Sequence, residues 1–250
     1  MRQRQRQFLA EGPHAVSAAL ARPGVVVEVF ATAGAERALR DQAEAAGARW
    51  SEVADDVVAA VADTVTPQGV VAVCRFLDVA IDEVFAPGTS LVVIGVDVRD
   101  PGNAGALLRC ADGVGADGVV LGGESVDPYN PKVVRASAGS LFHLPVAVHT
   151  DLPSLAAVAR AAGLQLLAAD GSADTDLDHA ERRGLLAQPT AWLFGNEAHG
   201  LPVAVRELTD EAVAVPLYGR AESLNLATAA AVCLYASARA RRLVERAPGE

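Results

Sequence analysis

The strongest constraint in this 250-residue sequence is an alternation of short apolar runs with longer helix-like segments between residues 91 and 244. Leu91–Asp97 is an almost uninterrupted apolar run, which is typical of a strand buried on both faces. Further strands are predicted at residues 118–121, 144–148, 165–169, 191–194 and 212–215, and helices at 104–114, 155–162 and 223–244. This alternation predicts an α/β fold with a mostly parallel sheet that is covered on both faces.

A smaller block precedes this region. Helices are predicted at residues 13–20 and 35–46, and strands at 25–30 and 70–74. We therefore expect a small α/β domain over residues 1–76, a linker over 77–89 and a larger domain over 90–250. The basic first seven residues predict a frayed, solvated tail, with an arm that contacts a polyanion as the alternative.

Composition limits the partners and the chemistry. Lys and Arg total 21 against 31 Asp and Glu, a net charge of −10, which argues against holding nucleic acid by bulk charge and leaves room for a local basic patch. The three cysteines, Cys74, Cys110 and Cys233, are far apart, so neither a disulfide framework nor a metal site is expected, and a reducing cytoplasm fits. No apolar run is long enough to span a membrane.

The first functional segment follows the strand at Leu91–Asp97. Ligands in open α/β sheets bind beyond the carboxyl ends of the strands, and Asn103 and Arg109 follow at this end. An arginine on an apolar helix is costly to bury unless it meets an anion or a hydrogen-bond partner. The segment contains no G-x-G-x-x-G pattern, which argues against an enzyme that binds a dinucleotide in a Rossmann turn.

Three more segments carry candidate residues. Lys132 and Arg135 are three residues apart on one predicted helical face, which indicates a phosphate-sized positive site or, equally, two solvated side chains. A glycine-rich turn with Glu197 follows the strand at 191–194. Ser223 is a candidate N-cap of the last helix, whereas Asn225 falls inside that predicted helix, where asparagine is unfavourable, so a functional role is the better explanation.

The four segments together resemble the SpoU (TrmH-like) family of RNA ribose 2′-O-methyltransferases, within the SPOUT superfamily. The resemblance rests on Asn103-x-Gly-x-x-x-Arg109, Asn130-Pro-Lys-Val-Val-Arg-Ala-Ser-x-Gly-Ser140, Phe194-Gly-Asn-Glu-x-x-Gly-Leu201 and Val215-Pro-x-x-Gly-x-x-Glu-Ser-Leu-Asn225. The first block resembles the family's small, ribosomal-protein-like substrate-binding domain, with Phe8–Gly12 and Thr66–Val73 as its borders.

The resemblance implies a fold, a cofactor and a set of site residues. It implies a C-terminal trefoil knot and transfer of a methyl group from S-adenosyl-L-methionine to a ribose 2′-hydroxyl of RNA, in which Lys132 and Arg135 contact the RNA. Arg109 matches the family's catalytic arginine, with Asn103, Glu197, Ser223 and Asn225 around it. The matching cofactor contacts are Ala168, Ala169, Asp170, Gly195, Asn196, Gly200, Val215, Pro216, Leu217, Leu224 and Asn225.

The sequence leaves more than one interpretation open for the role of Arg109 and for the RNA that is the substrate. Because arginine is ordinarily always protonated, the first interpretation is that Arg109 orients the ribose-phosphate and stabilises negative charge. The second interpretation is that Arg109 acts as a general base. Ribosomal RNA is the first choice of substrate and transfer RNA the second. A nucleotide-dependent enzyme of Rossmann type, or an RNA-binding module without catalysis, would be the competing functions.

The predicted helix at 223–244 is apolar around most of its circumference until Arg239. A helix of this kind must be buried on more than one side, and a second subunit is the simplest cover for the side that the sheet leaves open. We therefore expect a homodimer. The alternative is a helix that is covered entirely by its own domain.

Overall fold

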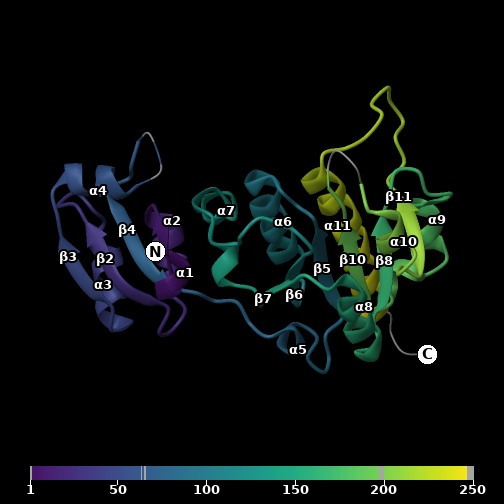
Figure 1. Ribbon diagram of the computed structural model, residues 1–250, viewed down its shortest axis with the longest axis horizontal. Helices are drawn as coiled ribbons and strands as arrows, with labels where there is room; N and C mark the ends of the chain where they lie inside the picture. Colours follow the sequence, from purple (N-terminus) through teal and green to yellow (C-terminus); the bar gives the residue numbers. More distant parts are fainter. Residues whose placement is uncertain (1, 63, 65, 197–199, 247–250) are drawn as a thin grey trace.

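The computed structural model describes residues 2–62, 64, 66–196 and 200–246. Within these residues the chain forms two α/β units that lie next to each other along the long axis of the molecule (Figure 1). The N-terminal unit, residues 2–75, contains a sheet in the order β1-β4-β2-β3, and the second unit, residues 91–246, contains a sheet in the order β7-β6-β5-β10-β8-β11-β9. The segment between them carries the short helix α5 (Ile81–Val84), whose Val84 is fully buried against the second sheet.

The sheet of the N-terminal unit is mixed. β4 pairs antiparallel with both β1 and β2, and β2 pairs parallel with β3. Its strands are β1 (Gln7–Glu11), β2 (Val26–Ala31), β3 (Arg49–Glu52) and β4 (Val70–Arg75), and its helices are α1 (Arg2–Gln5), α2 (Pro13–Leu20), α3 (Arg37–Ala45) and α4 (Asp55–Val61). The predicted helices and strands of this unit are therefore confirmed, with α4, β1 and β3 in addition.

The predicted frayed tail is wrong from Arg2 onward. Arg2–Gln5 form α1, and Gln7–Glu11 form the edge strand β1. The partner of β1 is β4, which pairs Phe8 with Cys74 far along the chain, so a local sequence pattern could not reveal the strand.

All pairings of the second sheet are parallel. Its strands are β5 (Leu91–Val96), β6 (Gly118–Gly122), β7 (Val146–His149), β8 (Gln165–Ala169), β9 (Thr175–Asp176), β10 (Thr190–Phe194) and β11 (Glu211–Ala214). The helices are α6 (Pro101–Val114), α7 (Pro131–Ala136), α8 (Leu152–Ala161), α9 (Leu177–Arg182), α10 (Val203–Arg206) and α11 (Leu226–Arg246), with 3-10 turns at Ser140–Phe142 and Leu185–Ala187. The predicted α/β class with a parallel sheet is confirmed; the trefoil knot stays a prediction.

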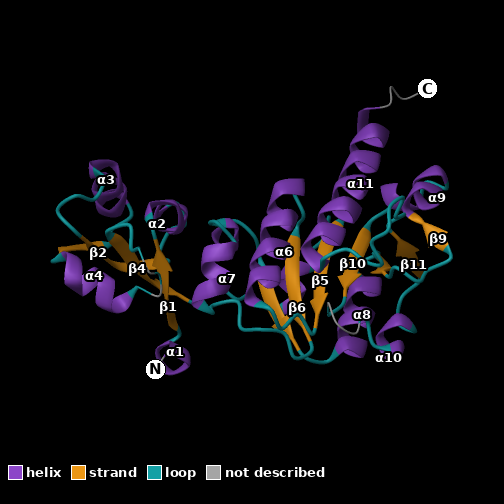
Figure 2. Cartoon of the chain, turned by 90° about the horizontal axis from the view of Figure 1, so that it is seen from above, coloured by secondary structure: helices purple, strands orange, loops and turns teal. Residues whose placement is uncertain are grey.

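Two helical layers enclose this sheet. α6 and α11 cover one face, and α8 and α10 cover the other (Figure 2). Successive side chains of a strand point to opposite faces, so Leu91 and Val93 of β5 join the core under α6 and α11, whereas Val92 and Ile94 join the other core. Helix α11 is tied to the sheet by a buried hydrogen bond of 2.9 Å from Trp192 Nε1 to Ser237 Oγ.

Helix α11 begins at Leu226, three residues later than predicted. Asn225 supplies the N-cap, because its Oδ1 accepts a hydrogen bond of 2.9 Å from the Ala227 N–H. Ser223 is therefore not the cap, and Leu224 lies in the preceding loop. Among the described residues, the helices are too short or too polar to cross a membrane.

Helices α6 and α7 cross at a glycine. A Cβ atom at Gly105 would lie 2.5 Å from the Ala136 Cβ and 2.7 Å from the Val133 carbonyl oxygen. Alanine is therefore excluded unless one of the two helices moves. α6 itself is well delimited, since Asp100 accepts a hydrogen bond from the Asn103 N–H at one end and Gly115 takes a left-handed conformation at the other.

The crossing predicts opposite effects for two glycines of the same helix. Gly105→Ala should lower the free energy of unfolding by about 1–3 kcal/mol because the backbones must separate. Gly113→Ala, whose Cβ would meet only the end of the Tyr235 side chain at 3.4 Å, should raise it by up to about 1 kcal/mol through helix propensity. Urea unfolding of both variants checks this, and equal effects would contradict the close crossing.

Candidate active site

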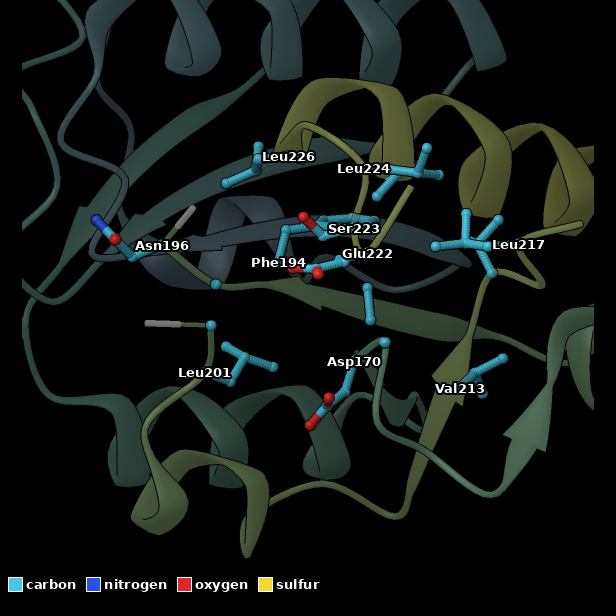
Figure 3. Close-up of a pocket in the computed structure, with 16 residues that line it drawn as sticks. Asp170, Phe194, Asn196, Leu201, Val213, Leu217, Glu222, Ser223, Leu224 and Leu226 are labelled. Atoms are coloured by element: carbon cyan, nitrogen blue, oxygen red, sulfur yellow. The ribbon is translucent and has the colours of Figure 1, made fainter. Parts of the chain in front are cut away.

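A cavity of about 260 Å³ lies at the carboxyl ends of β8, β10 and β11, beside the start of α11. In Figure 3, Phe194, Glu222 and Ser223 face Leu201 and Asp170 across it. Its described lining consists of Ala169, Asp170, Gly171, Phe194, Gly195, Asn196, Gly200, Leu201, Val213, Val215, Leu217, Glu222, Ser223, Leu224, Leu226 and Ala229.

Most of the predicted cofactor residues line this cavity. They are Ala169, Asp170, Gly195, Asn196, Gly200, Val215, Leu217 and Leu224, and the predicted catalytic Ser223 lines it as well. Pro216 and Asn225 are not among the lining residues, and Ala168 is fully buried in the core between the sheet and α8. Glu197 lies outside the described residues, so its place in the site stays a prediction.

The turn after β10 requires glycine at its start. A Cβ on Gly195 would lie 2.4 Å from backbone atoms of Gly200 and Leu201, because the two ends of the turn come together. The closure is a backbone hydrogen bond of 2.7 Å from the Gly200 N–H to the Asn196 carbonyl. Asn196 also donates to the carbonyl of Asp97 at 3.0 Å, which fixes this turn to the end of β5.

Asp170 is held in place from two sides. Its Oδ1 accepts hydrogen bonds from the backbone and hydroxyl of Ser172 at 2.9 and 2.7 Å, and its Oδ2 accepts one of 2.9 Å from Arg206 of α10. Burial alone would raise the pKa of this carboxyl, but the bonds from Ser172 and Arg206 outweigh burial and lower the pKa below its ordinary 3.8. Asp170 is therefore a fixed negative charge at the cavity near neutral pH.

The predicted catalytic residues are only partly brought together. Asn225 donates a hydrogen bond of 2.9 Å to Asn103, which joins the start of α11 to the first turn of α6 next to the cavity. Arg109 is exposed, about 9 Å further along α6, and is not part of the cavity lining. The interpretation of Asn225 as a residue inside the helix is wrong: it caps the helix, and its amide still reaches Asn103.

The two predicted RNA-binding residues lie on α7, away from the cavity. Lys132 is exposed, whereas Arg135 is half-buried and forms an ion pair of 3.5 Å with Glu11 of the N-terminal unit. The helix is capped by Asn130, whose side chain accepts a hydrogen bond from the Lys132 N–H. Arg135 is thus not a freely solvated cation but part of the contact between the two units.

Sequence reasoning missed several lining residues. Gly171 and Val213 lie at the ends of strands β8 and β11, where the rule about strand ends could have found them. Phe194 and Leu201 border the glycine-rich turn, and Leu226 lies in the first turn of α11. Arg206 could not be found in this way, because it acts only by contacting Asp170 across the fold.

Comparison with known proteins gives the family. Residues 90–235 match the model of the SpoU rRNA Methylase family, and residues 1–72 match the MRM3-like substrate binding domain. The chain belongs to the SpoU rRNA methylase family. The SpoU match spans the seven-stranded sheet and the start of α11 up to residue 235, including every described residue that lines the cavity.

Curated SpoU relatives and solved SpoU structures cover nearly the whole chain. The chain is 37% identical to the 23S rRNA (guanosine(2553)-2′-O)-methyltransferase RlmP of Bacillus subtilis, over 91% of this chain and 87% of that protein. It is 34% identical to the 23S rRNA (guanosine-2′-O-)-methyltransferase RlmB of Bordetella pertussis, over 94% and 98%. The AdoMet complex of the SpoU methyltransferase AviRb from Streptomyces viridochromogenes superposes with a TM-score of 0.84 at 32% identity, over 97% and 93%.

The ionisable side chains in the described lining of the SpoU cavity are all acidic. Among its described lining residues, the ionisable groups are the carboxylates of Asp170 and Glu222, and neither lysine nor arginine is present. Nor do the described residues bring together three or more His, Cys, Asp or Glu side chains that could hold a metal ion. The cavity therefore suits a ligand that carries positive charge better than a pyrophosphate.

The capping role of Asn225 can be separated from its contact with Asn103. Asn225→Ala should lower the free energy of unfolding by about 1 kcal/mol, because the first N–H groups of α11 lose their acceptor. Asn225→Ser keeps a capping oxygen but is too short for Asn103, so its stability should stay close to that of the unchanged protein. Urea unfolding compares them; a serine variant as unstable as the alanine variant would contradict the cap.

Proposed function

We propose that this protein is an S-adenosyl-L-methionine-dependent methyltransferase that acts on a ribose 2′-hydroxyl of RNA. The observation that carries the proposal is the cavity at the strand ends, which has apolar walls and two carboxylates and, in its described lining, no basic residue. Family membership and the AdoMet complexes of SpoU relatives support the same cofactor.

The residues of the cavity fit this cofactor by chemical type. S-adenosyl-L-methionine supplies a methyl group on a positively charged sulfur. Leu201, Val213 and Leu217 would provide apolar surface for a flat adenine. Asp170, kept ionised by hydrogen bonds from Ser172 and Arg206, would accept hydrogen bonds from hydroxyl groups and place a negative charge near the sulfonium. The fit disfavours a dinucleotide, whose phosphates would meet these carboxylates.

Arg109 is the proposed catalytic residue. Its planar guanidinium would bind the ribose-phosphate and stabilise the negative charge that develops on the 2′-oxygen as that hydroxyl releases its proton to solvent. Acceptance of that proton by Arg109 is the alternative, and it would need a cofactor carboxylate or an RNA phosphate to help. Asn103, Asn225, Ser223 and Glu197 complete the proposed catalytic set, of which Asn103 and Asn225 form a hydrogen bond with each other. Ala168, Pro216 and Asn225 remain proposed cofactor contacts through the backbone.

The proposed substrate is ribosomal RNA, with transfer RNA second. RlmP and RlmB, which the chain resembles over nearly its whole length, are named 23S rRNA 2′-O-methyltransferases. Residues 1–76 would select the RNA and residues 90–250 would carry the chemistry, on either side of the 77–89 linker, with Lys132 and Arg135 contacting the RNA backbone. Such an enzyme would work in the cytoplasm, where ribosomal RNA is modified.

The activity is tested on Arg109. Arg109→Ala should lower transfer of a labelled methyl group to 23S rRNA by about 100-fold or more, and Arg109→Lys should fail similarly, since an ammonium group cannot reproduce the planar fork. Calorimetric titration with S-adenosyl-L-methionine should give nearly the same affinity for all three proteins.

Arg160→Ala is the matched control, because Arg160 lies on α8 at the opposite face of the sheet, partly exposed, and pairs with Asp210. Most of the activity should survive in that variant. Retention of most activity in Arg109→Ala would overturn the assignment of Arg109, and transfer to tRNA alone would overturn the choice of rRNA.

A homodimer through α11 is the second part of the proposal. α11 buries Leu234 and Ser237 against its own sheet but leaves Tyr235 57% and Leu243 62% exposed on another side. A second copy would cover these apolar side chains, and it would also lie beside α6, which packs on α11 and presents the exposed Arg109.

Light scattering at micromolar concentration checks the dimer. The unchanged protein should show twice the chain mass of 25.7 kDa, and the double variant Tyr235→Glu/Leu243→Glu should show 25.7 kDa. The double variant Val57→Glu/Val61→Glu introduces the same two charges at exposed valines of α4 in the N-terminal unit and should leave the mass unchanged. A monomer that persists with cofactor present would refute the dimer.

A further inference from the structure

One tyrosine of the second unit lies buried where the two units meet. Tyr129, in the loop before α7, is 3% exposed, and its ring stacks on Phe76 with 3.9 Å between centroids. Phe8 of β1 lies 4.7 Å from the same ring and 5.9 Å from Phe142 of the second unit. We refer to Phe8, Phe76, Tyr129 and Phe142 as the joint. It brings Phe8 of the N-terminal unit and Phe76 of the connecting segment into one apolar cluster with two rings of the second unit.

The hydroxyl of Tyr129 holds the start of the connecting segment. It accepts hydrogen bonds from the backbone N–H groups of Leu77 and Asp78, and it donates to the Asp78 carboxylate at 2.9 Å. Burial raises the pKa of Tyr129, and the neighbouring carboxylate raises it further, so the phenol keeps the proton that it donates. One hydroxyl therefore fixes two consecutive residues at the exit of the N-terminal unit.

Asp78 is held from the N-terminal unit as well. Arg6 Nη2 lies 3.2 and 3.0 Å from the two carboxylate oxygens, and its guanidinium lies 5.2 Å from the centre of the Phe76 ring. Burial opposes ionisation of Asp78, but the hydrogen bonds from Arg6 and Tyr129 outweigh it and lower its pKa below 3.8. Asp78 thus connects a cation of the first unit to a phenol of the second.

The segment that carries Tyr129 continues into helix α7. On that helix Arg135 pairs with Glu11 of β1, a second contact between the units, and α7 packs closely on α6 at Gly105. Helix α6 carries Asn103 and Arg109. The orientation of the N-terminal unit is therefore set by the same segment that packs against the helix of the proposed catalytic residues.

We propose that Tyr129 is a positioning residue, which holds the N-terminal unit at one angle so that RNA bound there presents its ribose at Arg109 and the cavity. Methyl transfer needs the two reacting groups in near-attack geometry, and a displacement of about 1 Å can cost about 100-fold in rate. A flexible linker would allow the N-terminal unit many orientations, of which few would place the ribose correctly. The inference rests on the proposed function for the RNA, whereas the fixed angle itself can be measured without RNA.

Tyr129→Phe tests the proposal, because it removes the hydroxyl and keeps the stacked ring. The rate of methyl transfer to rRNA in a single turnover at saturating enzyme should fall by about 10–100-fold. The dissociation constant for S-adenosyl-L-methionine should stay within about twofold and that for rRNA within about threefold, because neither binding surface is altered. Thr89→Val, which removes a hydroxyl that bonds the Val84 carbonyl at 3.2 Å elsewhere in the connecting segment, is the matched control and should keep the rate of the unchanged protein.

The orientation of the N-terminal unit relative to the second unit is tested with two spin labels, one on each unit. The width of the distribution of distances between the labels reports how firmly that orientation is fixed. The labels are attached to cysteines introduced at Val57 of α4 and Val203 of α10, both exposed, in a Cys110→Ser background, with labelled chains diluted in unlabelled ones. Tyr129→Phe should broaden a distribution that is narrow in the unchanged joint. Three results for Tyr129→Phe would each overturn the proposal. They are a distance distribution that is not broadened, a single-turnover rate within twofold of the unchanged protein, and a loss of cofactor affinity as large as the loss of rate. An inactive parent protein would refute the proposed function, while the distribution would still decide whether Tyr129 fixes the angle.

Discussion

Strands β5 and β10 lie side by side at the centre of the seven-stranded sheet, and every side chain of both strands is buried. A strand that is covered on both faces cannot carry charged groups along its length, since unpaired charge in such a core is costly. Chemistry is therefore confined to the ends of the strands, where the backbone leaves the sheet. The turn after β10 and the loops after β8 and β11 meet there, and they form the cavity.

The described lining of the cavity carries carboxylates, while Arg206 contacts Asp170 from outside that lining. The cavity contains Asp170 and Glu222, whereas the cations Arg109 and Lys132 lie outside it on α6 and α7. Under the proposed function, the carboxylates would face a cationic cofactor and these cations would face an anionic RNA, so an acidic protein could act on a polyanionic substrate. Net charge alone, at −10, could not have revealed this arrangement.

Features with a local cause could be predicted from the sequence. Buried strands such as Leu91–Val96, and glycine-rich turns at strand ends such as Gly195–Gly200, follow from apolar runs and backbone geometry that a short stretch of sequence encodes. What failed depends on contacts far along the chain. Strand β1 exists because β4 pairs with it, and Arg206 contacts Asp170 from α10, a contact between residues far apart in the chain. The sequence offers both Ser223 and Asn225 as capping residues, and the predicted start at Ser223 puts Asn225 inside the helix, whereas Asn225 is the cap.

The contribution of α11 to the cavity has a consequence for synthesis. Leu226 and Ala229 of this helix line the cavity, and its Ser237 is bonded to Trp192 of the central sheet. A nascent chain that has produced all the strands therefore still lacks one wall of the cavity. The N-terminal unit, whose strands all come from residues 7–75, can fold while the rest is being translated. The order of synthesis thus makes the unit that is proposed to select the RNA available before the cavity for the methyl donor is complete.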